Sequence, residues 1–259
     1  IQKKLKKYKT EFIPVDSEHF SIRELLNKNI NNIEEVIITA SGGPFLNLPF
    51  KNFKKIKPKN AIKHPNWKMG SKISVDSATL MNKVFEVIEA QRIFNIDINK
   101  FKIYIHPKSY VHAVIKFNNG LTKILVHDTN MTIPIFNIIY SNLEKTIVTK
   151  KIDFKTLNNL NFQIPNKTKF PSLNLLNKFT SKISLYETVL VTANDELVNL
   201  FLLGQIRFTE IAQMLKKILE LKEFTKFKQI MPKNYEQIHK LNRYVRLKTF
   251  SLSVLSRKW

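Results

Sequence analysis

Two carboxylates separated by one residue give the chain its first possible metal site. Asp16 and Glu18 flank Ser17, where an apolar run ends and a helical pattern begins. In an extended segment the side chains at i and i+2 point the same way, so both carboxylates can face one site. Hard oxygen donors of this kind suit Mg²⁺ or Mn²⁺. Spacing alone also fits, and favours, a simple helix cap with Glu18 in the first turn.

A second group of polar residues has helical spacing. Ser77 is predicted at a helix N-terminus, where free N–H groups attract anions. Asn82, Lys83 and Glu86 follow at spacings that place them on one helix face. That face could offer a phosphate-binding cation, an amide and a metal carboxylate. In isolation the same spacing favours an ordinary ion pair on a solvated face.

Two loops could contact a ligand. Ser41, Gly42 and Gly43 follow a β-branched run, and their N–H groups could approach a phosphate closely or could simply form a tight turn. The segment 64–70 (HPNWKMG) carries His64 and a tryptophan, which suits a lid over a site. The alternative is a tryptophan that anchors the loop on the core. His106 is interpreted as structural.

These groups must be positioned by an α+β domain followed by helices. Strands are expected over 11–15, 35–40, 101–106, 110–117 and 121–126, and helices over 17–28, 77–94 and 133–142. The pattern predicts a mixed sheet with flanking helices. From residue 173 the periodicity is helical only (172–180, 183–203, 209–222, 234–249), which predicts a small C-terminal helical bundle. We expect a catalytic domain over 1–143, a linker over 144–172 with little structure, and a helical domain over 173–259.

Local signals refine these helices. Asp76 or Ser77 is expected to cap the helix that carries Lys83, Gly204 to end a helix, and Thr209 to cap the next one. Residues 51–72 look irregular, with two prolines.

Composition excludes several classes of protein. The 259 residues contain no cysteine, which rules out disulfides, thiolate metal sites and cysteine nucleophiles. The formal net charge is +23, but only six of the 43 basic residues are Arg, so general surface charge is favoured over a dedicated nucleic-acid site. The longest uncharged apolar stretch, 129–143, is too short and polar to span a bilayer. With no targeting segment visible, we expect a cytoplasmic protein, or an organellar one in a eukaryote.

Five motifs in order carry more information than any one of them. The series VDSEH, SGGPF, HPNWKMG, KISVDSATLMNKVFEVIEA and HPKSYVH resembles the 1-deoxy-D-xylulose 5-phosphate reductoisomerase family. The resemblance runs from about residue 9 through TANDELVNLFLLGQIRFTEI, which ends at residue 211.

The resemblance implies roles for individual residues. The divalent metal ligands would be Asp16, Glu18 and Glu86. The substrate-binding residues would be Ser17, Ser41, His64, Ser77, Asn82, Lys83 and Glu86, with the phosphate held by Ser41, Ser77, Asn82 and Lys83. The flexible flap that closes for catalysis would include His64, Trp67 and Met69. Ser109, His112 and Pro134 would lie near the substrate or its supporting shell.

The resemblance also implies an activity. The family isomerises 1-deoxy-D-xylulose 5-phosphate and reduces it to 2-C-methyl-D-erythritol 4-phosphate with NADPH and Mg²⁺ or Mn²⁺, in isoprenoid biosynthesis, as a homodimer. The alternative is a metal-dependent phosphosugar-binding protein without redox chemistry. A nucleic-acid or membrane partner is not expected.

The sequence departs from the family in three places. Val84 replaces the usual glycine after the lysine, and TANDE (192–196) replaces an NAANE type of sequence. The chain has five glycines and no GxGxxG fingerprint. We therefore expect that the NADPH-binding domain is absent from this chain and that the chain alone is inactive.

Overall fold

A computed structural model describes residues 2–26, 32–67, 69–141 and 143–255 of the chain. The chain divides into two compact units, residues 1–41 with 89–164 and residues 42–88 with 165–259. Helix α5 (Met81–Phe94) runs through the boundary, so both units contain part of it. The domain boundaries expected at residues 143 and 173 stay predictions.

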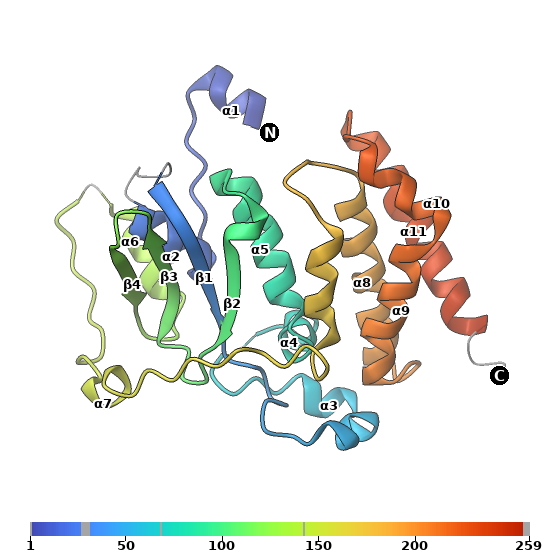
Figure 1. Ribbon diagram of the computed structural model, residues 1–259, viewed down its shortest axis with the longest axis horizontal. Coiled ribbons are helices and arrows are strands. Elements are labelled where there is room, and N and C mark those ends of the chain that lie inside the picture. Colours follow the sequence, from blue (N-terminus) through green and yellow to red (C-terminus); the bar gives the residue numbers. More distant parts are fainter. Residues whose placement is uncertain (1, 27–31, 68, 142, 256–259) are drawn as a thin grey trace. The chain divides into compact units, whose positions relative to one another are not determined.

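The first unit is built on a four-stranded sheet with the spatial order β2-β1-β3-β4 (Figure 1). Its strands are β1 (Ile33–Ala40), β2 (Phe101–Ile105), β3 (Val111–Phe117) and β4 (Thr122–Val126). β1 and β2 are parallel, whereas β3 is antiparallel to both β1 and β4. All but one of the residues of β3 are buried, which accounts for its nearly continuous apolar run. The sheet and its helices confirm the predicted mixed α+β class.

Helices cover this sheet and extend the unit. They are α1 (Gln2–Tyr8), α2 (Ser17–Leu26), the short η3 (Ile98–Lys100), α6 (Thr132–Ile139) and α7 (Phe154–Leu157). Helix α2 packs against β1, β3 and β4 and buries Phe20, Ile22 and Leu25. The strand predicted over 11–15 is wrong: the segment is irregular, because Pro14 has no N–H to donate to a neighbouring strand. The last residues of the helix predicted over 17–28 lie outside the described part of the chain.

The carboxyl ends of the parallel pair meet at one edge of the sheet. Ala40 pairs with Ile105, and the His106 N–H donates to the Ala40 carbonyl at 2.7 Å. Ile105 also exchanges two backbone hydrogen bonds with Gln163, at 2.8 and 2.9 Å. The segment 144–172, expected to have little structure, thus contributes this bridge and α7 to the first unit.

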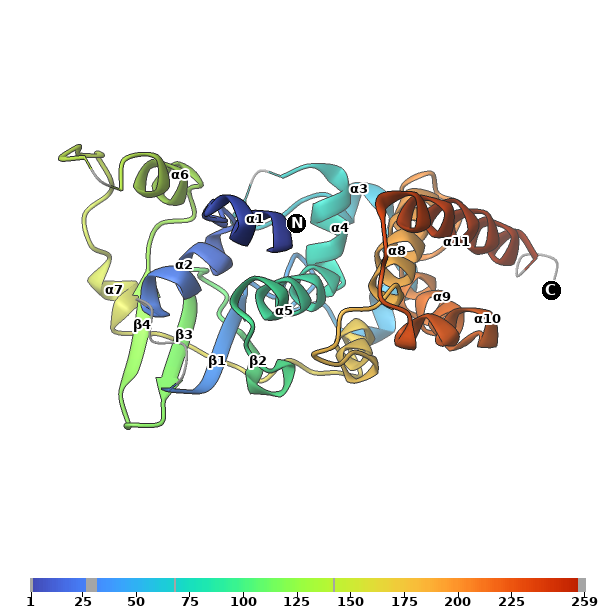
Figure 2. The ribbon, with the colours of Figure 1, turned by 90° about the horizontal axis from the view of Figure 1, so that it is seen from above.

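The second unit is helical. Its elements are η2 (Phe50–Lys55), α3 (Pro58–Ala61), α4 (Ser71–Ala78), η4 (Pro171–Lys178), α8 (Tyr186–Leu202), α9 (Phe208–Glu220), α10 (Lys222–Thr225), η5 (Lys226–Gln229) and α11 (Tyr235–Leu255). Helix α8 is the centre, because it packs on α4, α9 and α11; Figure 2 shows α9 and α11 beside it. The helical C-terminal part is confirmed. The segment 51–72 is more ordered than predicted, since it contains η2, α3 and the start of α4.

Two of the predicted helix ends can be checked directly. Gly204 follows α8 with φ 70°, the left-handed conformation that favours glycine, so this prediction is confirmed. Thr209 does not cap α9. The cap is Arg207, whose N–H donates to Glu210 at 2.5 Å.

The single helix predicted over 77–94 is in fact two. Helix α4 ends at Ala78, α5 starts at Met81, and Leu80 between them has φ 58°. A left-handed leucine costs about 1–2 kcal/mol, but Leu80 is only 1% exposed and its burial offsets that cost by about 1.5–3 kcal/mol. Asp76 and Ser77 therefore lie in the last turn of α4, and the prediction that one of them caps the helix is wrong.

None of the helices in the described ranges has the length and apolar content that crossing a bilayer requires.

Candidate functional site

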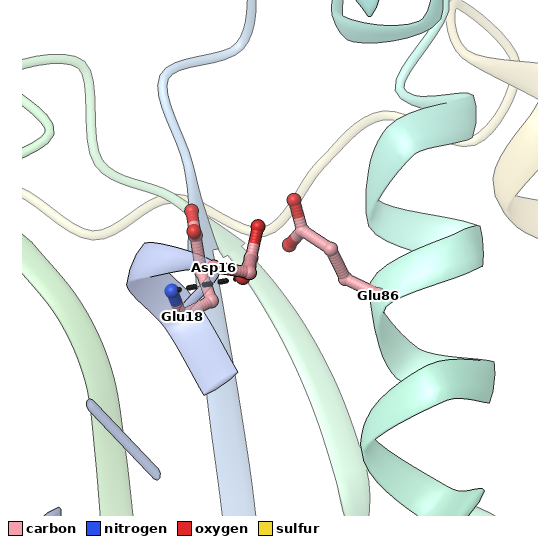
Figure 3. A group of neighbouring side chains, drawn as sticks. All are labelled: Asp16, Glu18 and Glu86. Carbon is pink, nitrogen blue, oxygen red and sulfur yellow. Dashed lines mark hydrogen bonds between the residues drawn. The ribbon is translucent and has the colours of Figure 1, made fainter. Parts of the chain in front are cut away.

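Three carboxylates from separate parts of the sequence come together. Asp16, Glu18 and Glu86 each offer an oxygen, and these oxygens lie within 4.8 Å of one another (Figure 3). Asp16 precedes α2, Glu18 lies in its first turn, and Glu86 projects from α5. Three hard oxygen donors at this separation fit Mg²⁺ or Mn²⁺. The family resemblance implies these three residues as ligands, and the structure brings all of them together.

Asp16 also caps helix α2. Its Oδ1 accepts hydrogen bonds from the N–H groups of Glu18 at 3.1 Å and His19 at 3.2 Å. A cap and a metal ligand each need one oxygen, so the two interpretations left open by the sequence are compatible. The cap fixes the carboxylate beside the first turn, where Glu18 lies. Ser17 is buried, and its hydroxyl donates to the Glu18 carboxylate.

The far end of the helix that carries Glu86 contacts α2. Phe94, at the end of α5, contacts the ring of His19 on α2, with ring centroids 6.5 Å apart. Glu86 lies about two turns earlier on the same helix. The ring contact thus links the end of α5 to α2, whereas the Glu86 carboxylate itself is held by Asn82 and Lys83.

Lys83 and Asn82 converge on Glu86. The Lys83 ammonium lies 2.7 and 3.0 Å from the two Glu86 oxygens, and the Asn82 amide also donates to that carboxylate. The prediction that these three share a face is confirmed. The solvated-face alternative is wrong, because Lys83 and Glu86 are only 8% and 3% exposed. Burying an ion pair costs desolvation free energy. A buried Lys83–Glu86 pair is therefore typical of a functional site and not of an ordinary surface ion pair.

Asn82 and Lys83 occupy the first turn of α5. The Met81 N–H donates to the hydroxyl of Thr79 at 3.3 Å, which caps this end. The anion-attracting helix terminus expected at Ser77 therefore lies at residues 81–83, because Leu80 interrupts the helix. Val84, next to Lys83, is fully buried in the core.

The turn after β1 packs against the end of α4. Gly42 and Gly43 have φ of 85° and 66°. A Cβ at Gly43 would lie 2.9 Å from the Ser77 carbonyl oxygen. Only glycine fits this approach, since both the backbone conformation and the space exclude a side chain. The tight-turn interpretation is confirmed, and the turn places its glycines beside half-buried Ser77; Ser41 directly precedes them.

The predicted flap is a loop ordered by His64. Its Nδ1 accepts the N–H groups of Asn66 at 3.1 Å and Trp67 at 3.0 Å, so this nitrogen carries no proton. Burial, and then the charge of Lys83, lower the pKa of His64 to about 4. His64, Trp67 and Met69 line an open depression of about 620 Å³. The intervening residue 68 lies outside the described ranges.

The remaining residues proposed from the resemblance lie in the first unit. Ser109 is buried with φ 52°, and Pro134 is buried in α6. His112 is buried in β3 and stacks on His127, with ring centroids 3.7 Å apart and planes at 12°. His106 is buried, its Nδ1 lies 3.2 Å from the Asn161 carbonyl, and burial lowers its pKa. These contacts agree with a structural His106.

His127 was not among the residues proposed from the sequence. Its Nδ1 donates to the Asp128 carbonyl at 2.7 Å, and burial lowers its pKa, against the opposing effects of that carbonyl and of Glu18. A lone histidine directly after β4 has no recognisable spacing to the motif residues, so only the fold reveals that it stacks on His112.

A second charge cluster, around the buried carboxylate of Asp76, joins α4 to α8. Asp76, 2% exposed, accepts from the Asn194 amide at 2.7 Å and from the Lys72 ammonium at 3.0 Å. Lys72 also lies 2.9 Å from Asp195. Burial raises the pKa of Asp76 against the pull of Lys72 and Asn194. Asn194 and Asp195 are the centre of the TANDE segment, whose unusual sequence was the available signal.

Family models match most of the chain. A model described as the 1-deoxy-D-xylulose 5-phosphate reductoisomerase C-terminal domain matches residues 12–94, and one described as the DXP reductoisomerase C-terminal domain matches residues 127–248.

Curated relatives agree with these models. The chain is 58% identical to a 1-deoxy-D-xylulose 5-phosphate reductoisomerase of Pelagibacter ubique over 98% of its length, and 40% identical to one of Persephonella marina over 88%. It spans 66% and 60% of the lengths of these relatives, which is less than two thirds in each case.

Solved structures show the same fold. A crystal structure of DOX-P reductoisomerase in complex with NADPH, fosmidomycin and magnesium has a TM-score of 0.85 at 31% identity, covering 95% of this chain and 64% of that one. The Zymomonas mobilis enzyme in complex with NADPH has a TM-score of 0.83 at 29% identity, covering 96% and 63%.

Proposed function

Because the chain belongs to the 1-deoxy-D-xylulose 5-phosphate reductoisomerase family, we propose that it forms the metal- and substrate-binding part of such an enzyme. The reaction would isomerise 1-deoxy-D-xylulose 5-phosphate and reduce the product with NADPH to 2-C-methyl-D-erythritol 4-phosphate. The observation that carries the proposal is the cluster of Asp16, Glu18 and Glu86.

The carboxylate cluster fits a divalent cation. It offers oxygens only, matching the preference of Mg²⁺ and Mn²⁺. A bound ion of this kind polarises a carbonyl and lowers the pKa of a neighbouring hydroxyl. Magnesium is present in related structures of the family. Asp16 and Glu18 are held by the start of α2, and Glu86 by α5.

The first turn of α5 is suited to hold the substrate phosphate. Lys83 supplies a charge, Asn82 an amide, and the helix N-terminus supplies backbone N–H groups. Lys83 now pairs with Glu86, so metal binding to that carboxylate would leave the ammonium available to an anion. We propose that Ser77 and Ser41 complete the phosphate site and that Ser17 contacts the substrate beside the metal. Fixing the inert phosphate orients the reactive end.

The flap would close over the bound sugar. His64 is neutral at pH 7, since its pKa is about 4, so it can approach Lys83 without repulsion between two cations. Trp67 and Met69 supply apolar surface that excludes water from the reacting carbons.

NADPH would supply the hydride, and we assign no residue of this chain to its binding. Related structures of the family contain NADPH. The family membership favours this redox function over the phosphosugar-binding alternative considered from the sequence. A homodimer, a cytoplasmic location and the absence of a nucleic-acid partner stay predictions.

Two measurements test the proposal. The chain alone should bind Mn²⁺, seen by electron paramagnetic resonance, and binding should compete with Mg²⁺. A fusion with the part of the Pelagibacter ubique relative that this chain does not span should oxidise NADPH when given the ketose phosphate and Mg²⁺. A folded fusion that binds Mn²⁺ and shows no turnover would disprove the redox function, whereas loss of Mn²⁺ binding would disprove the metal site.

A further inference from the structure

A cavity of about 260 Å³ lies in the second unit, and none of the residues assigned to metal or phosphate lines it. Its walls come from η2, the segment 169–172, α9 and Thr79. Buried aromatic rings form much of the lining, with Phe53 and Phe170 each 2% exposed and Phe208 5% exposed. The volume is that of roughly nine liquid waters. The cavity is therefore large enough for a small organic molecule.

The aromatic wall is held by edge-on ring contacts. Phe53 lies edge-on to Phe208, with centroids 5.8 Å apart and planes at 70°, and to Phe170 at 6.3 Å and 62°. Phe45 supports Phe208 from behind, at 5.2 Å and 77°. Rings fixed in this way cannot rotate freely to fill the space. A flat apolar group would find preformed surfaces to contact.

The charge at this cavity is of one sign. Lys51, Lys54 and Lys169 line it, and no acidic side chain does so among the residues that the structure describes. The Lys169 ammonium lies 5.5 Å from the Phe53 ring centroid and 5.8 Å from that of Phe170, and it donates to the Leu46 carbonyl at 2.5 Å. Burial lowers its pKa. This ammonium has donors to spare and only neutral partners, so an anion would stabilise it.

We propose that the cavity binds a small organic anion with a flat aromatic body, its ring packed among Phe53, Phe170 and Phe208 and its anionic group paired with Lys169. The sugar phosphate is a poor fit, because burying its hydroxyls against an apolar wall would leave them without hydrogen-bond partners. The cavity is thus a separate ligand site, and it does not rest on the proposed reductoisomerase function.

Three probes of one size test the site on the chain as it exists: benzoate, phenyl phosphate and benzyl alcohol. Calorimetric titration should show saturable binding of both anions, at least about tenfold tighter than the neutral alcohol, which is the effect expected of one charge-assisted hydrogen bond. The tighter of the two anions identifies whether the site prefers a carboxylate or a phosphate. Absence of saturable binding of either anion, or equal binding of the alcohol, would overturn the proposal.

Variants test the contribution of the Lys169 charge separately from that of the apolar cavity wall. Lys169→Met should weaken both anions about tenfold and leave benzyl alcohol unchanged, whereas Lys150→Met, at an exposed position in the other unit, should change nothing. Ala212→Leu, which adds bulk inside the cavity, should weaken all three probes without lowering the melting temperature. Unchanged anion affinity in either cavity variant contradicts the assignment. Mn²⁺ binding, measured on the same samples, should be unaffected and so reports on the other proposal separately.

Discussion

The second unit contains two lysine–carboxylate clusters, each around a buried carboxylate, that differ in how they are built. Asn82, Lys83 and Glu86 lie within five residues on one helix. Lys72 and Asp76 on α4 instead reach Asn194, 118 residues away from Asp76, on α8. The first cluster can exchange its partners without moving a helix, as a ligand site must. The second ties two helices together, so losing it should cost stability and not binding.

The strongest test of this contrast is Asp76→Ala. Removing the carboxylate leaves the buried Asn194 amide without its acceptor, whereas Lys72 is half exposed and keeps Asp195, so the free energy of unfolding should fall by about 1–3 kcal/mol. Urea denaturation followed by circular dichroism measures it. Asp195→Ala is the matched control: this carboxylate is 31% exposed, and its loss should cost about 1 kcal/mol or less. Equal effects would show that the buried contact of Asp76 with Asn194 adds no more stability than the partly exposed ion pair of Lys72 with Asp195.

Glu86→Gln, in contrast, should mainly weaken metal binding. Replacing one of three oxygen ligands should weaken Mn²⁺ affinity, and turnover of the completed enzyme, at least about 100-fold. Glu89→Gln, at an exposed position one turn along α5, should keep both. Retained Mn²⁺ affinity in a folded Glu86→Gln protein would remove Glu86 from the metal site. Combining it with Lys83→Met should restore stability but not metal binding, because no buried charge is then left unpaired.

Lys83→Met and Lys72→Met compare the two ammonium groups directly. With Mn²⁺ present, Lys83→Met should weaken inorganic phosphate binding about tenfold, the loss expected of one charge-assisted hydrogen bond. Lys72→Met should leave phosphate affinity unchanged, because its ammonium is held by Asp76 and Asp195. Isothermal titration gives both values. Weaker phosphate binding in Lys72→Met would contradict the assignment of Lys72 to a structural cluster and of phosphate binding to Lys83.

The smallest effect concerns the titration of His64. Nuclear magnetic resonance of the free chain should give a pKa of about 4, and Lys83→Met should raise it, because the lysine charge is part of the cause. Bound phosphate should also raise it by offsetting that charge. The unfolded chain binds this proton more tightly than the folded chain, so the His64 contribution to stability grows as the pH rises from about 4 to 6.5 and is lost on acidification. An unchanged His64 pKa in Lys83→Met would show that the flap histidine is not coupled electrostatically to the phosphate cluster.

Sequence spacing predicted what is local. The shared face of Asn82, Lys83 and Glu86 follows from helical periodicity, and the glycine turn from its composition. The meeting of Asp16 and Glu18 with Glu86 came only from resemblance to a family, since spacing cannot bring residues 68 positions apart together.

Sequence could not predict what depends on packing between distant segments. The Asp76–Asn194 contact and the cavity lined by Phe53, Phe170 and Phe208 join residues whose order along the chain carries no periodic signal. The single helix predicted over 77–94 was wrong at Leu80 for a different, local reason. Its helical pattern was genuine, but burial of its side chain outweighs the cost of a left-handed backbone.

The break at Leu80 has a mechanical consequence. An unbroken helix from Ser71 to Phe94 would be a rod of roughly 36 Å. Any tilt of its first turn, where the flap joins it at Gly70, would then also displace Glu86. The break divides the rod into α4, of 8 residues, and α5, of 14. Displacement at the flap end can then be absorbed at the joint, and the Glu86 carboxylate keeps the hydrogen bonds that it receives from Asn82 and Lys83 on α5.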